Sequence, residues 1–128
     1  MGDLLAWGAG WLDAQRHQHL TRPVFYTRGI ASVEVLATIG KTVFESDNGY
    51  GILERSESRD YLIRAEDLVL DGVPVLPKRG DRVRETQDTK VYVYEVLAPG
   101  SVPEWRYSDP YRRTLRIHTK LVATEDAP

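Results

Sequence analysis

The most regular alternation of apolar and polar residues lies between positions 79 and 120. Residues 82–85 alternate after a turn signal, and residues 90–97 are rich in Val and Tyr, which suit a pleated, half-buried surface. In residues 114–121, positions 115, 117, 119 and 121 share one face, whereas the basic positions share the other. The pattern predicts three antiparallel strands with one buried face and one exposed basic face.

Period-two segments also precede this region. Residues 24–26 begin a strand, and residues 31–39 and 60–64 suit strands as well. Residues 98–111 contain three prolines and a glycine, so they are expected to interrupt the ladder. Roughly six or seven short strands with frequent turn signals predict a mainly β fold. We expect a small antiparallel β-barrel of the SH3 or OB kind, or a sandwich, with one or two long loops.

Two segments determine how the upstream strands connect. Gly40-Lys41 has the form of a two-residue hairpin turn with glycine first, which predicts a strand end at Ile39 and a new strand from Thr42. Residues 46–59 begin with a turn rich in Asp, Asn and Gly and end in charged residues. They fit either a hairpin with a mobile tip or a long loop, and long loops in compact domains are usually functional or disordered.

Helical spacing of apolar residues is confined to the N-terminal segment. Asp3 is a suitable N-cap for a helix over residues 2–20. Its apolar positions are Leu4, Leu5, Trp7, Trp11 and Leu12. They predict either an assembly interface, where tryptophan is enriched, or a helix that covers the domain's own core. The resulting organisation is a helical segment at 1–22, a β-barrel domain at 23–122 and a tail at 123–128.

Charge and composition narrow the class of protein. The chain has 128 residues and a net charge of −2, but residues 78–120 hold ten Lys/Arg against six Asp/Glu. This asymmetry suits a subunit with one side toward a polyanion, or a mixed surface with chance clustering. The absence of cysteine excludes disulfides and thiolate chemistry. No apolar run approaches the ~18 residues of a membrane span, so we expect synthesis in a cytoplasm.

Catalytic and metal-binding patterns are weak. His17 and His19 would point to different sides of a helix, and His118 is expected on the exposed face of a strand. The loop carboxylates give no recognisable acid/base pair, and no glycine-rich phosphate loop lies between a strand and a helix. We therefore expect no enzyme, no cofactor site and no metal site.

Aromatic residues in the second half interleave with arginines. Trp105, Tyr107 and Tyr111 alternate with Arg106, Arg112 and Arg113. This mixture suits a surface for single-stranded nucleic acid, and the same residue types dominate protein interfaces. A third interpretation is that the aromatic rings pack beneath a long loop.

Several spaced segments together resemble the head-closure proteins of long-tailed bacteriophages, also called head–tail joining or stopper proteins. The segments are Pro77-x-x-Gly80-Asp81-Arg82-Val83, Val91-Tyr92-Val93-Tyr94-Glu95-Val96, Trp105-Arg106-Tyr107-Ser108-Asp109 and Leu115-Arg116-Ile117-His118-Thr119-Lys120. The upstream Arg59-Asp60-Tyr61-Leu62-Ile63 agrees with them. The resemblance covers about residues 24–120 and consists of strand and turn residues, with no catalytic signature.

The resemblance implies a β-barrel subunit of a homo-oligomeric ring in the virion neck. Such a ring lies under the portal or its adaptor, retains the packaged double-stranded DNA and offers the docking face for tail or tail-terminator proteins. It also implies a loop that projects into the channel, and the best candidate residues are Asp47, Asn48, Gly49, Tyr50 and Gly51. Residues 98–111 are the second candidate for this loop.

The charge and apolar character of the side chains identify the remaining residues expected to make contacts with DNA or with other subunits. Non-specific contact with DNA is expected from Arg82, Arg84, Arg116, His118 and Lys120. Assembly contacts are expected from the apolar helix residues and from Trp105, Tyr107 and Tyr111. Two alternatives stay open: a small OB-like or SH3-like nucleic-acid-binding module, and a tail-terminator ring subunit.

Overall fold

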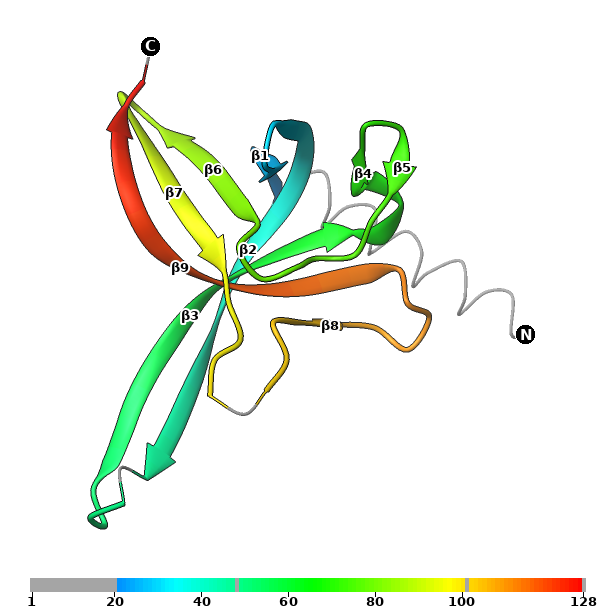
Figure 1. Ribbon diagram of the computed structural model, residues 1–128. Coiled ribbons are helices and arrows are strands. Elements are labelled where there is room, and N and C mark those ends of the chain that lie inside the picture. Colours follow the sequence, from blue (N-terminus) through cyan, green and yellow to red (C-terminus); the bar gives the residue numbers. More distant parts are fainter. Residues whose placement is uncertain (1–20, 48, 101, 128) are drawn as a thin grey trace.

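The computed structural model describes residues 21–47, 49–100 and 102–127 and has a mainly β fold (Figure 1). In chain order the elements are β1 (Thr21–Arg28), β2 (Ala31–Asp47), β3 (Leu53–Arg64), the short 3-10 helix η1 (Ala65–Asp67), β4 (Val69–Leu70), β5 (Val73–Pro74), β6 (Arg82–Gln87), β7 (Lys90–Val96), β8 (Trp105–Tyr107) and β9 (Thr114–Asp126). The predicted helix over residues 2–20 lies outside the described residues. None of the helices in the described ranges is long and apolar enough to cross a membrane.

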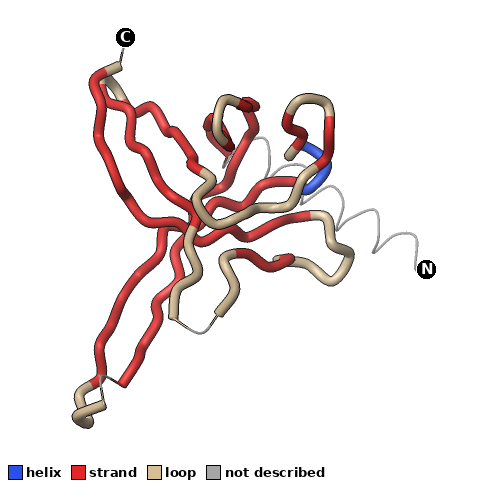
Figure 2. Tube along the Cα trace, in the orientation of Figure 1, coloured by secondary structure: helices blue, strands red, loops and turns tan. Residues whose placement is uncertain are grey.

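The main sheet closes on itself. Its order is β3-β2-β1-β6-β7-β9, and β9 pairs again with β3, so these strands form a ring of antiparallel pairs (Figure 2). β8 adds three residues to the outer edge of β9. Closure gives each of these strands a partner on both sides, which removes the unpaired edges that make open sheets prone to association. The mainly β, antiparallel prediction is confirmed.

The strands β2 and β3 extend beyond the ring. The segment of β3 from Arg59 to Ile63 pairs with both β2 and β9, whereas its first part, from Leu53, pairs with β2 alone. The β2–β3 hairpin therefore projects from the ring as a two-stranded arm (Figure 1). Of the two interpretations of residues 46–59, the hairpin is correct.

The core fills the ring and one of its ends. Alternate residues of β1, β2, β3, β6, β7 and β9 point inward, and Leu68, which follows η1, and Leu70 of β4 join them. The buried apolar cluster is Val24, Tyr26, Val35, Ala37, Tyr61, Ile63, Leu68, Leu70, Val83, Val96, Leu115 and Ile117. The inward face predicted for Leu115, Ile117 and Thr119 is confirmed, because all three are fully buried.

The predicted hairpin turn at Gly40-Lys41 is wrong. β2 runs through both residues, and Gly40 pairs directly with Asp60 of β3. Gly40 is not among the residues with positive φ, so the backbone has no need of glycine's extra freedom there. A Cβ at this position would lie 3.4 Å from Leu62 Cδ1 and 3.5 Å from Arg116 Nη1. Gly40 therefore lies inside β2 beside the Arg116 guanidinium, and it does not mark a turn.

Gly40→Ala tests this correction. We expect its free energy of unfolding to change by no more than about 0.5 kcal/mol, because alanine restricts the unfolded chain and its Cβ meets neighbours at ordinary contact distances. Gly80→Ala is the matched control: Gly80 has a φ of 92°, so alanine there should destabilise the fold by about 1 kcal/mol. Chemical denaturation measures both. A loss in Gly40→Ala equal to that in Gly80→Ala would contradict the continuous strand.

β9 is longer and less regular than predicted. It continues to Asp126, so residues 123–126, expected to form a tail, pair with β7. The register shifts between Val93 and Tyr94, whose partners are Ala123 and Leu121. Val122 is the extra residue of a β-bulge, and such a bulge bends a strand. Leu121 was expected on the buried face, but it is 47% exposed beside this bulge.

Candidate functional site

The arm formed by β2 and β3 ends in a tight turn. The carboxylate of Asp47 accepts the backbone N–H of Gly49 at 2.9 Å. Gly49 and Gly51 have φ values of 91° and 77°, which explains glycine at both positions. The predicted channel-loop residues Asp47, Gly49, Tyr50 and Gly51 thus lie at the far end of the arm, and Asn48 lies outside the described residues (Figure 1).

The arm combines an apolar tip with an acidic shaft. Tyr50, Ile52 and Leu53 are 88%, 60% and 68% exposed. Between positions 43 and 57 the described residues include four carboxylates, from Glu45, Asp47, Glu54 and Glu57, and one basic side chain, Arg55. An exposed apolar tip is typical of a contact with another molecule. The net negative charge of the shaft repels DNA phosphates, so this arm cannot be drawn to DNA by charge.

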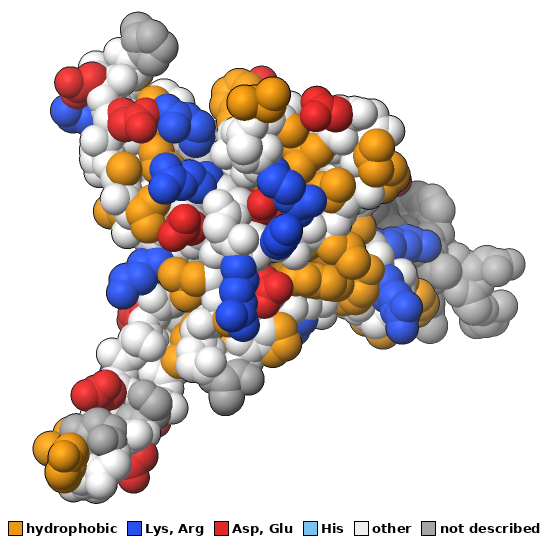
Figure 3. Space-filling model, in the orientation of Figure 1, with side chains coloured by type: hydrophobic (Ala, Val, Ile, Leu, Met, Phe, Trp, Pro, Cys, Tyr) orange, Lys and Arg blue, Asp and Glu red, His pale blue; other side chains and the backbone are white. Residues whose placement is uncertain are grey.

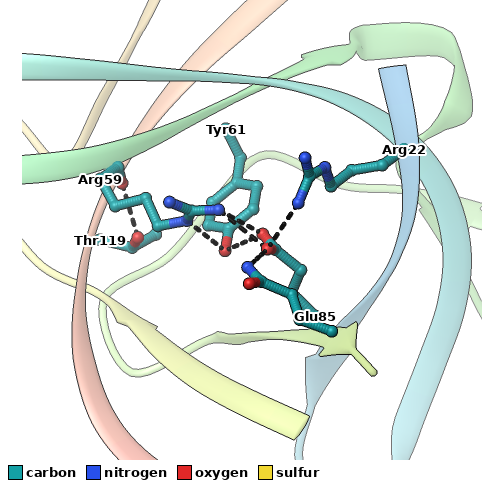
Figure 4. Close-up of polar contacts among 6 residues, drawn as sticks. Arg22, Arg59, Tyr61, Glu85 and Thr119 are labelled. Carbon is teal, nitrogen blue, oxygen red and sulfur yellow. Dashed lines mark hydrogen bonds and ion pairs between the residues drawn. The ribbon is translucent and has the colours of Figure 1, made fainter. Parts of the chain in front are cut away.

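A buried carboxylate, Glu85, organises the inside of the ring (Figure 4). Arg59 Nη2 donates to both oxygens of Glu85 at 2.8 Å, and the Tyr61 hydroxyl donates to Oε1 at 2.9 Å. Arg22 Nη1 and the side-chain amide of Gln87 also donate hydrogen bonds to Glu85. Glu85 is fully buried, so its charge depends entirely on these partners. Burial acts to raise the pKa of Glu85, but the hydrogen bonds from Arg59 and its other donors hold the pKa below its usual value.

A second buried carboxylate, Asp60, lies outside the ring, where β2, β3 and β9 meet. Arg116, Thr42 and Ser58 donate to it, and His118 Nδ1 lies 2.8 Å from its Oδ1. Burial acts to raise the pKa of Asp60, but these hydrogen bonds, led by that of His118, hold it well below its usual range. Sequence reasoning missed this cluster, although Gly40 opposite Asp60 was a signal of close packing.

The predicted exposure of His118 is wrong. Its side chain is 5% exposed, and the ring of Phe44 packs edge-on against it with centroids 5.5 Å apart. Arg116 is also mostly covered, with 22% of its side chain exposed and its guanidinium paired to Asp60. Both residues lie on the predicted face of β9, but the adjoining arm covers that face. Both side chains are therefore engaged within the subunit.

Ser58, Asp60 and His118 form no catalytic triad. The Ser58 hydroxyl lies 2.6 Å from Asp60 Oδ1 and 3.3 Å from His118 Nδ1. The same Nδ1 lies 2.8 Å from Asp60, so its proton is donated to the carboxylate and it cannot accept a proton from serine. All three residues are buried. Their arrangement stabilises the fold and offers no activated nucleophile. Among the described residues, no three potential metal ligands cluster together.

A third buried carboxylate, Asp81, fixes the turn before β6. Arg28 donates to its two oxygens at 2.9 and 2.8 Å, and the Tyr26 hydroxyl and the backbone N–H of Lys78 also donate to it. Burial and the Asp81 carboxylate together raise the pKa of Tyr26. The turn signal at Arg79-Gly80-Asp81 is confirmed, and the carboxylate is what joins this turn to β1.

Three of the predicted DNA-facing residues share one outer face. In the register, Arg82 of β6, Glu95 of β7 and Lys120 of β9 form one cross-strand row. Arg84 reaches over β7 to pair with Glu125. Figure 3 shows acidic and basic side chains interleaved over these strands. The outer face of β6, β7 and β9 therefore has mixed charge and is less basic than predicted.

The predicted aromatic interface divides into two parts. Trp105 and Tyr107 are partly buried and pack against the core, with their ring centroids 5.1 Å apart. The interpretation of rings packed beneath a loop therefore describes these two. Tyr111 is 76% exposed and stacks with Arg113. The other predicted assembly residues, Leu4, Leu5, Trp7, Trp11 and Leu12, lie outside the described residues.

The chain matches the model of a known protein family. A family model described as phage head-tail joining protein matches residues 2–126, nearly the whole chain. No curated protein matches the chain.

Proposed function

Because the chain belongs to the family of phage head-tail joining proteins, we propose that it closes the DNA-filled head below the portal or adaptor and presents the docking surface for the tail. A protein of this family contacts components of both head and tail, and its role is structural. The buried carboxylates Asp60, Asp81 and Glu85 each pair with an arginine from another part of the fold, which supports a structural role.

The proposed assembly is a homo-oligomeric ring around the DNA channel. The closed ring of strands supports a small antiparallel barrel of the SH3 or OB kind, with the arm outside it. A scaffold without open edges in its core can present the arm and the turn before β9 as separate contact elements. In this arrangement the partners are further copies of the chain, the portal or adaptor above, and tail or tail-terminator proteins below.

The projecting arm is the observation that carries the closure role. Its tip holds exposed Tyr50, Ile52 and Leu53 on a turn with two positive-φ glycines. A tip of this kind can meet its copies from neighbouring subunits and obstruct the channel by apolar contact. Attraction between the tip and DNA is not required, which agrees with the acidic shaft. We assign the channel loop to residues 47–51 on this basis.

Shortening the tip tests closure. Deleting residues 49–51 keeps every carboxylate of the shaft, so the subunit should still fold and join the neck. We expect full heads to lose packaged DNA, measured as the fraction of nuclease-accessible DNA in purified heads. Tyr50→Ser is a milder variant and should give partial leakage. Heads that incorporate the shortened subunit and stay full would contradict the assignment.

Non-specific DNA contact is proposed for Arg82, Arg84 and Lys120. Arg82 pairs with Glu95 at 3.9 Å and Arg84 pairs with Glu125, so any attraction to DNA is reduced and screened by salt. The alternative of an OB-like or SH3-like nucleic-acid-binding module draws on exposed Tyr111 beside Arg113. Titration with a single-stranded oligonucleotide separates the two: submicromolar, salt-sensitive binding by the monomer would favour the alternative.

Disrupting the gene separates head closure from tail termination. Full heads that lack tails and leak DNA are expected for closure. Normal heads beside tails of abnormal length would indicate a tail-terminator subunit instead.

A further inference from the structure

The outer edge of β8 has no strand partner. Among the described residues the sheet order ends at β8, which pairs with β9 alone, and Figures 1 and 2 show no strand on its far side. The carbonyl of Glu104 and the N–H of Ser108 bond to β9, each at 2.9 Å. Because the backbone groups of successive strand residues face opposite neighbours, those of Trp105 and Tyr107 point away from β9. We call this row of backbone groups the β8 edge.

The β8 edge is short and firmly held. Pro103 and Pro110 lack an N–H and bound the edge on either side, so a partner strand can pair over only a few residues. The Asp109 carboxylate accepts backbone N–H groups from the turn that follows it, the shortest at 2.8 Å. At the other end Glu104 pairs with Arg79 at 3.5 Å. An edge fixed in this way loses little conformational entropy when it binds.

The two faces of β8 differ in chemistry. The rings of Trp105 and Tyr107 lie against the core and contact one another edge-on. Arg106 lies on the opposite face, directly across from Arg116 of β9. Like charges in this position repel one another, and the Arg116 guanidinium is already paired with Asp60. The side chain of Arg106 is exposed and has no partner within the described residues. A carboxylate on the open side of Arg106 would offset this repulsion.

We propose that the β8 edge binds a short extended segment of a neighbouring head or tail protein, in which a carboxylate stands between two apolar residues. The segment adds a strand to the sheet, and its backbone pairs with the free N–H and C=O groups of Trp105 and Tyr107. Its carboxylate lies across from Arg106, and its apolar side chains pack beside the two rings. The choice of a head or tail protein rests on the proposed docking function, whereas recognition of the segment itself does not.

Other occupants match the β8 edge less well. In the described part of the chain, the strand segments of this pattern are Val33-Glu34-Val35 and Tyr94-Glu95-Val96, and both already pair within the ring. DNA offers phosphates to Arg106 but no amide groups to the edge. The alternative role for Arg106 is protection, because charged side chains deter unwanted strand pairing. Protection requires no carboxylate in a partner, so the two roles can be separated.

Peptide titration tests the β8 edge in the full chain. The probe is a capped heptapeptide with central Val-Glu-Val and threonine flanks, added at roughly millimolar concentration because a few backbone hydrogen bonds bind weakly. By NMR we expect slower hydrogen exchange at the amides of Trp105 and Tyr107, whereas the amide of Arg106 already faces β9 and should not change. N-methylation of both valines should abolish binding, because their N–H groups face β8. N-methylation of the glutamate should not.

Arg106→Glu distinguishes recognition from edge protection. It should weaken binding of the Val-Glu-Val peptide by about tenfold and favour a Val-Lys-Val peptide instead. Arg55→Glu changes an exposed arginine on the arm and is the matched control, with the binding of the wild type. The proposal is overturned if Arg106→Glu keeps the wild-type preference. It is equally overturned if Arg106→Thr binds both peptides more tightly than the wild type, since Arg106 would then only protect the edge.

Photo-cross-linking identifies the partner in assembled necks. A photoreactive residue in place of the exposed Ser108 lies next to the edge and leaves Arg106 intact. We expect a covalent link to a head or tail protein, located by mass spectrometry in a segment with the predicted pattern. Links only to DNA or to another copy of the chain would overturn the choice of partner. Head closure is measured separately by DNA leakage, so failure of the β8 contact and failure of closure are distinguishable.

Discussion

Glu85→Ala is expected to lower the free energy of unfolding by about 3–5 kcal/mol, the usual result of breaking a buried ion pair by removing one partner. The substitution leaves the Arg59 guanidinium without its main acceptor in the interior of the ring and deprives the Tyr61 hydroxyl of its acceptor (Figure 4). Arg59 also lies 5.1 Å from the Tyr94 ring centroid, so its displacement would disturb the packing of β7. Urea denaturation followed by circular dichroism measures the change.

Two further variants make this prediction specific. Glu95→Gln removes an exposed carboxylate on the neighbouring strand, 3.9 Å from Arg82, and should change stability by less than about 0.5 kcal/mol. Replacing both partners, as R59M/E85L, removes the unpaired charge and should recover much of the loss. If Glu85→Ala were as stable as Glu95→Gln, Glu85 would not be the organising group of the interior.

Asp60→Asn is expected to lower the free energy of unfolding by about 3 kcal/mol. It should also reduce the loss of stability as the pH falls. The carboxylate accepts hydrogen bonds from four side chains, and an amide cannot replace it beside the Arg116 guanidinium. Since the folded pKa of Asp60 is depressed, its ionised form stabilises the protein fully above the unfolded pKa of about 3.9. That contribution is lost as pH falls through the folded pKa.

The pH dependence provides the measurement. Wild-type stability should fall between about pH 5 and pH 2, and Asp60→Asn should show a smaller fall over the same window. Glu57→Gln, an exposed position on the same strand, serves as control and should keep the wild-type slope. An unchanged slope in Asp60→Asn would show that other carboxylates, Glu85 among them, carry the acid sensitivity alone.

The local alternation of apolar and polar residues was sufficient to predict most of the strands. The alternation of residues 31–39, 60–64, 90–97 and 114–121 marked β2, β3, β7 and β9, because a half-buried strand needs apolar side chains at every second position. The turn before residues 82–85 was also predicted, and the structure places Gly80 there with a positive φ. The spacing of these segments also resembled the head–tail joining family, to which the chain belongs.

The residues whose surroundings were predicted wrongly are contacted by residues from distant parts of the chain. Gly40 resembles a turn residue locally, but it lies inside β2, paired with Asp60 of β3 and beside Arg116, 76 positions later. His118 occupies a polar position of an alternating strand, yet Asp60 and Phe44 of the arm enclose it. Trp105 and Tyr107 precede a proline-containing loop, but β9 draws them onto the core.

The sequence by itself determined the mainly β class, most of the strands and the family, because each depends on spacing along a few neighbouring residues. Only the tertiary structure decided which charges are free. Asp60, Asp81 and Glu85 resemble surface acids in the chain, but the folded structure buries each of them against an arginine. The physical reason is that a charge in the interior is stable only with its partner in place. Here each partner comes from another strand, at separations of 26 to 56 residues.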